Sequence, residues 1–510
     1  MTISRRSLLR TGGSLVGAAA LNTSIFGGAF AETPKKGGTL KVASGGSSTG
    51  DSLDPTTYAG NYPMTLGYMW GRPLFRVDGN MELVPDAAEG HDVTPDAKTW
   101  IVKIRQGLEF PNGKSFTASD AVWTINRHRQ EGMASGLQSN LSQIESMEAT
   151  SPTEVTFKLK AANADWLYVL TDYHLLMQPE GAPTDEGLGL GPYTIEAYEP
   201  GNRALLKRNP RYWRDDVAHY ETIEFYAIND ASARTSALQT GEIDLALQVP
   251  SKIARLLEMA GFSIHQRPAA AFSEIVAQVD NDPFTNKDLV LALKYGLNRQ
   301  DLMDKVFFGV GDIGNDHPIP SFFRYHAADL PQTAYDPDKA KYHFDKAGIS
   351  GDVPALAMAP MLFYTSGLEV AELYQQQLKA AGINLAIDRV PDNGYWANVW
   401  NQRPFFAGGW FGRPTEDQML TSAYHSEAVY NGSHYKDPML DQLLLDARSE
   451  LDEDKRRQLY FDAQEMVNQN AGTIIPYFTA LLSATSSNVA GIQISPVGDG
   501  SFVDDVYHVS

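Results

Sequence analysis

The chain has 510 residues, no cysteine, and 62 acidic against 42 basic side chains, which gives a formal net charge of −20. So acidic a protein is a poor match for nucleic acid or an anionic membrane, and we expect neither as a partner. Without cysteine it can form no disulfide, no thiolate metal site and no cysteine nucleophile.

The N-terminus has the features of an export signal. The adjacent pair Arg5-Arg6 stands before a weakly apolar, Gly/Ala-rich stretch at 12–20, and a small-x-small cleavage site follows at 29–31. The Ser-Arg-Arg-x-Leu-Leu context is typical of the twin-arginine pathway. We therefore predict that residues 1–31 are removed and that the protein reaches the periplasm. The alternative, a buried basic helix, is disfavoured because this segment carries arginines but no acid.

The first half of the exported chain is predicted to be rich in strands. Alternating apolar residues predict a strand at 39–44, and a Gly/Ser/Asp loop follows at 45–54. A helix around 121–125 is predicted with Thr117 or Ser119 as its N-cap. Further strands are predicted at 99–104, 144–149, 155–159, 194–198, 203–207, 222–228 and 243–247, with a helix at 230–240.

The pattern restarts near residue 270 and then alternates between strands and helices. Helices are predicted where apolar residues recur at helical spacing and a glycine often follows, at 286–298, 336–347, 368–381 and 452–470. Strands are predicted at 272–280, 384–390, 473–478 and 490–494. The chain is too long for a single hydrophobic core and has no long linker, so we expect mixed α/β lobes joined by hinge-like strand crossovers.

The sequence contains none of the common catalytic or metal-binding motifs. There is no phosphate-binding loop, no G-x-S-x-G elbow and no H-E-x-x-H. The pairs His317/His326 and His425/His434 are nine residues apart, which is not ligand spacing on a helix. We predict no enzyme, no metal and no cofactor. An exported hydrolase stays open as an alternative, because a carboxylate pair among so many acids cannot be located.

Several segments, taken together, identify a family. LEFPNGKSFTASD, GLGPY, ALQTGEID and YDPDKA occur in order with two further matching segments, and the six lie at 108–120, 189–193, 207–213, 237–244, 289–299 and 335–340. In these segments the chain resembles the extracytoplasmic solute-binding proteins of ABC importers, family 5, which bind peptides, nickel or opines. Gly191 and Gly241 suit positive φ, and Tyr212 and Trp213 are expected to be core aromatics.

The resemblance implies an α/β, two-lobed periplasmic binding protein fold of class II, of the large type, with a ligand cleft between lobes joined by a hinge. Lobe I is then expected to comprise 32–268 plus 484–510, with an extra subdomain at about 80–187. Lobe II is expected to comprise 269–483.

The resemblance also points to a ligand site in lobe II. Relatives usually read Gly-Trp-x-x-Asp-Tyr, and in peptide binders that aspartate holds the ligand's ammonium. Here Gly409 and Trp410 are followed by Arg413, whose guanidinium suits a carboxylate or phosphate instead. Trp410 is expected to be an apolar wall. The alternative is that Arg413 forms a structural salt bridge with Glu416 or Asp417.

Other candidates come from predicted loops. Ser44, Gly45 and Gly46 are expected to offer hydroxyl and backbone donors from lobe I. Dipeptide-binding relatives carry an arginine before the helix at 368–381, and the segment 361–364 has no basic residue here. Further candidate ligand contacts, each with surface or packing as the alternative, are Tyr58, Tyr173, His174, Tyr395, Trp396 and Arg403.

The function implied is that of a periplasmic receptor, expected to be a monomer, that captures a small carboxylate-bearing ligand and delivers it to the permease of an ABC transporter. An opine-type ligand is favoured. The alternatives within the family are a peptide or a nickel chelate, and a sensor on the same fold is a further possibility.

Overall fold

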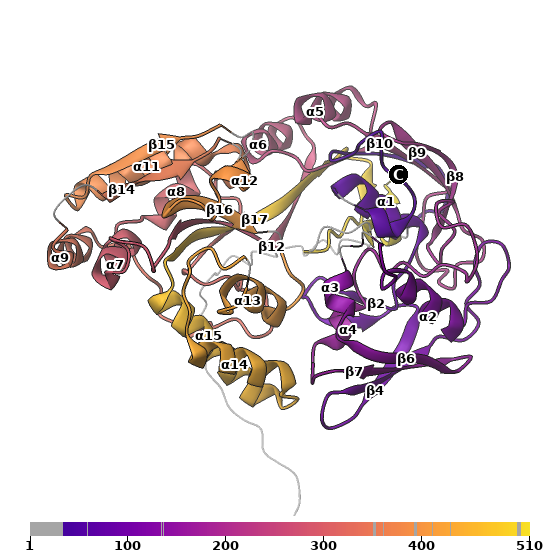
Figure 1. Cartoon of the computed structure of the whole chain (residues 1–510). Coiled ribbons are helices and arrows are strands. Elements are labelled where there is room, and N and C mark those ends of the chain that lie inside the picture. Colours follow the sequence, from indigo (N-terminus) through magenta and orange to yellow (C-terminus); the bar gives the residue numbers. More distant parts are fainter. Residues whose placement is uncertain are drawn as a thin grey trace, which may run out of the picture. The chain divides into compact units, whose positions relative to one another are not determined.

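The computed structural model describes residues 34–510 apart from 59, 134, 136, 350–352, 361, 392–394, 411, 429, 497–500 and 510. The predicted signal peptide therefore lies outside the described residues. Within the described part of the chain, most strands join one 11-stranded mixed sheet in the order β15-β14-β16-β12-β17-β11-β1-β10-β9-β8, with β13 paired to β17. Figure 1 shows β12 and β17 between two groups of strands.

One group of strands comes from the N-terminal half. β1 lies parallel to β10 and β11, while β8 and β9 form the predicted hairpin. Helix α5 begins at the N-cap Asp230 and ends at Gly241, whose φ of 76° is the left-handed conformation that favours glycine. The elements are β1 (Thr39–Ser44), β8 (Tyr193–Glu199), β9 (Arg203–Arg208), β10 (Thr222–Ala227), β11 (Leu245–Leu247), α1 (Asn61–Trp70), α5 (Ala231–Thr240), α6 (Ser251–Met259) and the 3₁₀ turn η1 (Pro55–Thr57).

A separate antiparallel sheet, which we call the small sheet, has the order β4-β5-β7-β6. Helix α2 packs on it and starts at Thr117, whose side chain forms a capping box with Asp120. The core between them includes Val102, Phe157 and Trp166, all fully buried. The elements are β2 (Phe75–Val77), β3 (Leu83–Pro85), β4 (Ala88–Val93), β5 (Thr99–Ile104), β6 (Ile144–Ser151), β7 (Glu154–Leu159), α2 (Ala118–Arg127), α3 (Gln138–Leu141) and α4 (Trp166–Val169).

The other group of strands in the large sheet comes from the C-terminal half. β14 is parallel to both β15 and β16, and α7 and α11 contribute apolar side chains to the core around these strands. The elements are β13 (Asp312–Ile313), β14 (Val353–Met358), β15 (Leu385–Arg389), β16 (Phe405–Trp410), α7 (Lys287–Tyr295), α8 (Arg299–Lys305), α9 (Pro337–Ala347), α10 (Leu362–Thr365), α11 (Gly367–Ala380), α12 (Tyr395–Asn398), α13 (Glu416–Tyr424), α14 (Pro438–Ser449) and α15 (Glu453–Asn470).

Two long strands connect the groups. β12 (Ser263–Ala277) and β17 (Thr473–Thr485) pair antiparallel along most of their length, with a register shift between Pro268 and Phe272. The sequence predicted only the second part of β12, because Pro268 breaks the strand pattern. Proline is tolerated here because 263–268 pairs with β17 alone, so one edge needs no donor.

Two local predictions were wrong. Gly191 does not adopt positive φ. It is needed because a Cβ there would lie 2.2 Å from the carbonyl carbon of Trp70, so the two backbones approach too closely for a side chain. The predicted strand at 490–494 is reduced to β18 (Val489–Ala490), which pairs with β19 (Tyr507–His508) near the 3₁₀ turn η2 (Ser501–Asp504).

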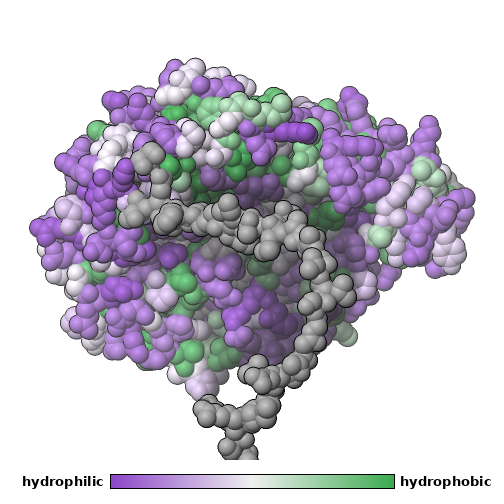
Figure 2. All heavy atoms as spheres, turned by 180° about the vertical axis from the view of Figure 1, so that it is seen from behind, coloured by the Kyte–Doolittle hydropathy of each residue, from purple (hydrophilic) through white to green (hydrophobic). Residues whose placement is uncertain are grey.

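The surface agrees with the acidic composition. The face opposite the view of Figure 1 is mostly hydrophilic, with hydrophobic residues in small groups (Figure 2). In residues 34–510, so far as they are described, no helix combines the length and the apolar character that spanning a membrane requires. Tyr212 and Trp213 pack against two different hydrophobic cores, as predicted.

Candidate functional site

The candidate site is organised by the carboxyl ends of parallel strands, where open α/β sheets place their ligands. The loop at Ser44–Gly46 follows the carboxyl end of β1. Trp410 is the last residue of β16, and Arg413 lies just beyond it. β1 and β16 run in opposite directions in the large sheet, so their carboxyl ends face each other across the middle of β12 and β17, and candidates come from both ends.

The Ser44 loop is held rigidly by its own contacts. The Ser44 hydroxyl is buried and donates to the Gly45 carbonyl, and the Gly45 amide donates to Gln248 Oε1 at 3.2 Å. Gly46 has a φ of 79°, which explains the glycine. Because the hydroxyl is already bonded, the loop defines the shape of this edge but does not present Ser44 as an unused donor.

Arg234 on α5 lies at the carboxyl ends of β10 and β11, and it was not named as a candidate from the sequence. Its buried guanidinium donates to the carbonyls of Leu247 at 2.8 Å and Gln248 at 2.9 Å, and it also bonds the Ile228 carbonyl at the end of β10. One side chain thus ties the ends of β10 and β11 together.

Arg413 is half-buried, and no hydrogen bond or ion pair joins it to the residues that the structure describes. The alternative prediction, a salt bridge from Arg413 to Glu416 or Asp417, is wrong. Both carboxylates are engaged with other residues. Glu416 Oε1 accepts from the Tyr325 amide at 2.7 Å, and Asp417 accepts from Arg448 Nε at 3.0 Å. Arg413 is therefore a cation without a protein counter-charge in the described part of the chain.

Tyr173 lies close enough to Arg413 for the two side chains to interact electrostatically, although they are far apart in the sequence. Burial, assisted by the charge of Asp172, raises the pKa of the Tyr173 hydroxyl to about 12, and the Arg413 guanidinium acts in the opposite direction. The Tyr173 ring packs against His174 with centroids 4.0 Å apart and the ring planes tilted by 32°. His174 links Asp172, at 2.6 Å, to the Tyr58 carbonyl, at 3.1 Å, so both of its ring nitrogens already have protein partners.

Trp410 is half-buried and is anchored by its indole. Nε1 donates to Glu274 Oε1 at 2.9 Å, and the ring meets Tyr430 edge-on at 6.3 Å. Trp400 lies next to Tyr430, with ring centroids 5.9 Å apart. Glu274, Trp400 and Tyr430 were missed from the sequence, although an acid inside the predicted strand FSEIVA was a usable signal for Glu274.

The other candidates are core residues, lie near the amino end of β16, are exposed on α12, or face away from Trp410. Tyr58 and Tyr395 are core residues, and the Tyr395 hydroxyl donates to the Ala407 carbonyl at 2.8 Å. Arg403 is exposed and precedes the amino end of β16, at the opposite end of the strand from Arg413. Trp396 is 51% exposed on α12, and Gly409 faces Ser273 on the other side of β16 from Trp410.

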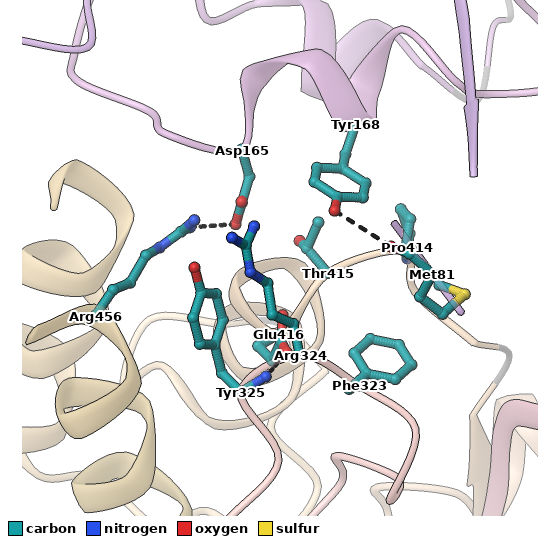
Figure 3. A pocket seen from close by; sticks show the side chains of 10 residues that line it. All are labelled: Met81, Asp165, Tyr168, Phe323, Arg324, Tyr325, Pro414, Thr415, Glu416 and Arg456. Carbon is teal, nitrogen blue, oxygen red and sulfur yellow. Dashed lines mark hydrogen bonds and ion pairs between the residues drawn. The ribbon is translucent and has the colours of Figure 1, made fainter. Parts of the chain in front are cut away.

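Beside Arg413, the small-sheet region meets α15. Asp165 and Arg456 form an ion pair in which both side chains are 7% exposed, and the Ala164 amide donates to the Arg448 carbonyl at 2.7 Å. In Figure 3 the Arg456 guanidinium points at Asp165, while the Tyr168 hydroxyl points at the Met81 carbonyl, 3.2 Å away. The cavity here has a volume of about 10 Å³, enough for one water molecule but not for a ligand.

Histidine and carboxylate side chains do not assemble into a metal site. In the part of the chain that the structure describes, no group of three or more His, Cys, Asp or Glu residues is placed to hold a metal ion. His317 and His326 do meet, with rings 5.3 Å apart, and burial lowers the pKa of His317 to about 3.

The family is decided by its sequence model. The model for bacterial extracellular solute-binding proteins, family 5 (middle region), matches residues 82–431. The chain belongs to this family. It is therefore a substrate-binding receptor of the ABC-importer type, and family 5 receptors work outside the cytoplasm. The predicted family and the two-lobed α/β fold are confirmed.

Named family 5 relatives resemble the chain over most of its length. The glutathione-binding protein GsiB of Escherichia coli (strain K12) is 26% identical over 478 residues, which is 89% of this chain and 92% of GsiB. GsiB of Pectobacterium atrosepticum is 25% identical over 477 residues, covering 90% of this chain and 92% of the relative.

Solved family 5 structures share the fold. CtaP of Listeria monocytogenes superposes with a TM-score of 0.82 at 23% identity, covering 93% of this chain and all of CtaP (100%). AgaA of A. tumefaciens R10, solved in complex with agropinic acid, gives 0.74 at 20% identity, and DppA of Helicobacter pylori, solved with a peptide, gives 0.73 at 22%. Both cover 93% of this chain and 99% of the solved chain.

Proposed function

We propose that this receptor captures a small, polar, carboxylate-bearing ligand in the periplasm, with an opine-type compound favoured, and delivers it to the inner-membrane permease of its transporter. The observation that carries the proposal is Arg413, a half-buried guanidinium without a carboxylate partner among the described residues. Partial burial of an unpaired charge is unfavourable, and a bound carboxylate would offset that cost through bidentate hydrogen bonds.

The proposed lobes are 32–268 with 484–510, including the subdomain at about 80–187, and 269–483. These boundaries fall inside β12 and β17, and the first lies at the register shift that follows Pro268. A shift in the middle of two long paired strands is a suitable place for a hinge. Closure about it would bring the Ser44 loop toward Arg413, which Tyr173 already approaches, and a ligand favours the closed state only by contacting both lobes.

Ligands other than opines remain alternatives, because proteins of family 5 bind several kinds of ligand. Relatives are named for glutathione, and solved neighbours hold agropinic acid, a peptide or Ni(L-His). A free-amine dipeptide is disfavoured here, since Arg413 replaces the acid that would hold its ammonium. Glutathione carries two carboxylates that suit Arg413, but its free ammonium meets the same objection. A hydrolase would have to turn over the bound compound, and the named relatives are binding proteins.

Calorimetric titration of the purified protein tests the proposal, with opines, glutathione, sugar acids and plain dipeptides as the ligand panel. We expect an acid-bearing ligand to bind best, and Arg413→Ala to weaken it about tenfold to a hundredfold through the lost charged hydrogen bonds. The matched control is Arg255→Ala, an exposed arginine on α6. Tight binding of plain dipeptides alone, or an unchanged affinity in Arg413→Ala, would reject the proposal.

A further inference from the structure

Glu274 is a buried carboxylate with no positive partner. It lies in β12 and is 5% exposed, with Oε1 accepting from Trp410 Nε1 at 2.9 Å and Oε2 accepting from the Thr473 hydroxyl. No lysine, arginine or histidine in the described part of the chain pairs with it. Burial raises the pKa of this carboxyl. An ionised group in such a place needs a cation to offset its lost hydration.

Three aromatic rings lie in a chain beside this carboxylate, with the N–H edge of Trp410 toward it. Trp410 meets Tyr430 edge-on at 6.3 Å, and Tyr430 meets Trp400 at 5.9 Å. Tyr430 is 54% exposed. The faces of such rings attract positive charge, most strongly when the charge lies over an indole.

Gly408 leaves a space about the size of one methyl group between Glu274 and the Trp400 Nε1 atom. A Cβ at this position would lie 3.4 Å from both Glu274 Oε1 and Trp400 Nε1, so a methyl group would occupy the space beside them. Strand alternation puts Gly408 and Trp410 on the same face of β16, toward Glu274. The strand is thus left without a side chain at the point where the carboxylate and the indoles converge.

We propose that Glu274, with Trp400, Trp410 and Tyr430, forms a subsite for a substituted ammonium group of the ligand. The inference rests on the proposed function: the same ligand would place its acid at Arg413 and would be zwitterionic. A primary ammonium needs three hydrogen-bond acceptors, and Glu274 already accepts from two donors. A nitrogen that carries alkyl groups needs fewer acceptors and presents its charge to the rings. The secondary ammonium of an opine has this character.

The test uses two probes that differ only in charge. Choline carries a trimethylammonium group, and 3,3-dimethylbutan-1-ol is its neutral carbon isostere. Neither probe has a carboxylate, so binding reports on the cation subsite independently of Arg413. Tryptophan fluorescence, checked by calorimetry, should give saturable binding of choline that is at least about tenfold tighter than that of the alcohol. Equal affinity for the two probes, or no saturable response to choline, would overturn the proposal.

Variants locate the effect. Glu274→Gln keeps the shape and an acceptor but removes the charge, so the preference for choline should disappear. Gly408→Ala should block choline without unfolding the protein, because its Cβ makes only ordinary contacts. Gly90→Ala, at a strand position with nothing within 4 Å, and Tyr342→Ala, an aromatic 61% exposed on α9, are the matched controls and should bind as wild type. Retention of the choline preference by Glu274→Gln would contradict the inference.

The same measurements separate this inference from the proposed function. Arg413→Ala should keep choline binding while it loses affinity for carboxylate ligands. If carboxylate ligands bind Arg413→Ala normally and the choline preference persists, the acid site is wrong and the cation subsite stands. If Arg413→Ala behaves as predicted but choline and the alcohol bind equally, the acid site stands and the cation subsite fails.

Discussion

At the scale of single residues, the arginines of this protein differ in whether the fold satisfies them. Arg299 pairs with Asp316 and Arg456 with Asp165, and Arg234 donates to strand-end carbonyls. These side chains have structural roles that the fold completes. Arg413 has no such partner among the described residues, and this contrast is the reason it is proposed to contact the ligand.

The buried carboxyl of Glu416 leads to a prediction, also at the scale of a single residue, about how stability depends on pH. Burial raises the pKa of its carboxyl to about 7, whereas an unfolded glutamate titrates near 4.3. Between these values the folded state binds more protons than the unfolded state, so the free energy of unfolding should fall as pH rises through this window. Glu416→Gln removes the buried charge and should be more stable at pH 8, on the order of 2 kcal/mol.

Denaturant unfolding at several pH values checks this prediction. Glutamine keeps an acceptor for the Tyr325 amide, so the loss of a hydrogen bond does not confuse the comparison. Burial also raises the pKa of Asp86 to about 6, so wild type keeps a slope of its own and only the difference between the two proteins reports on Glu416. Parallel stability curves for wild type and variant would contradict the prediction.

At the scale of elements, a buried ion pair joins the small-sheet region to α15, beside a hydrophobic core in which Val77 and Met81 pack with side chains of that helix. Asp165 stands just before α4, and Arg456 lies in the second turn of α15, where it also donates to the Ala447 carbonyl at 2.9 Å. The two segments are far apart in the sequence, so only the tertiary fold brings the two charges together. Because both are buried, each depends on the other for compensation.

Asp165→Ala should therefore destabilise the protein strongly. The change leaves the Arg456 guanidinium buried without its carboxylate, and we expect a loss of about 3–5 kcal/mol in the free energy of unfolding. The matched control is Glu199→Ala, which removes a pair to Arg203 whose side chains are 49% and 51% exposed and should cost within about 0.5 kcal/mol. Equal losses in the two variants, measured by denaturant titration, would show that burial does not decide this contact.

At the scale of the whole molecule, export and hinge motion are the two properties that a receptor of this kind requires. Export is proposed from the N-terminal segment alone. Replacement of Arg5 and Arg6 by lysines should stop passage through the twin-arginine pathway, so the precursor should accumulate in the cytoplasm. Cell fractionation with immunoblotting measures this, with Arg10→Lys as the control. Normal periplasmic accumulation of the double variant would exclude this route.

Local elements were predicted well where the signal lies within the element. The strands at 39–44 and 99–104 have the predicted bounds, and Thr117, one of the two predicted N-caps, caps α2, because capping depends on side-chain chemistry over a few residues. β16 was missed because FFAGGW does not alternate, being covered on both faces. The predicted strand at 272–280 began too late, because a proline normally argues against a strand. Pro268 is permitted in β12 because 263–268 pairs with a neighbour on one side only.

The candidate site was predicted only in part, because its residues come together through contacts between distant segments. Arg413 and Trp410 were named as candidates because a family motif marks their positions. Arg403, Tyr58 and Tyr395 have the same chemistry but lie at the wrong strand end or inside a core. Glu274, Trp400 and Tyr430 come from three separate segments, and nothing in their spacing shows that they meet.

By itself, the sequence determined the family, the α/β class, the absence of cysteine chemistry and the replacement of an expected acid by Arg413, since each of these is a property of residue types in order. Only the tertiary structure decided that Arg413 lacks an ion-pair partner among the described residues, that Glu416 and Asp417 are engaged elsewhere, and that Glu274 lies among aromatic rings. Charge compensation depends on distance and burial, and these arise from contacts between segments that the order of residues does not specify.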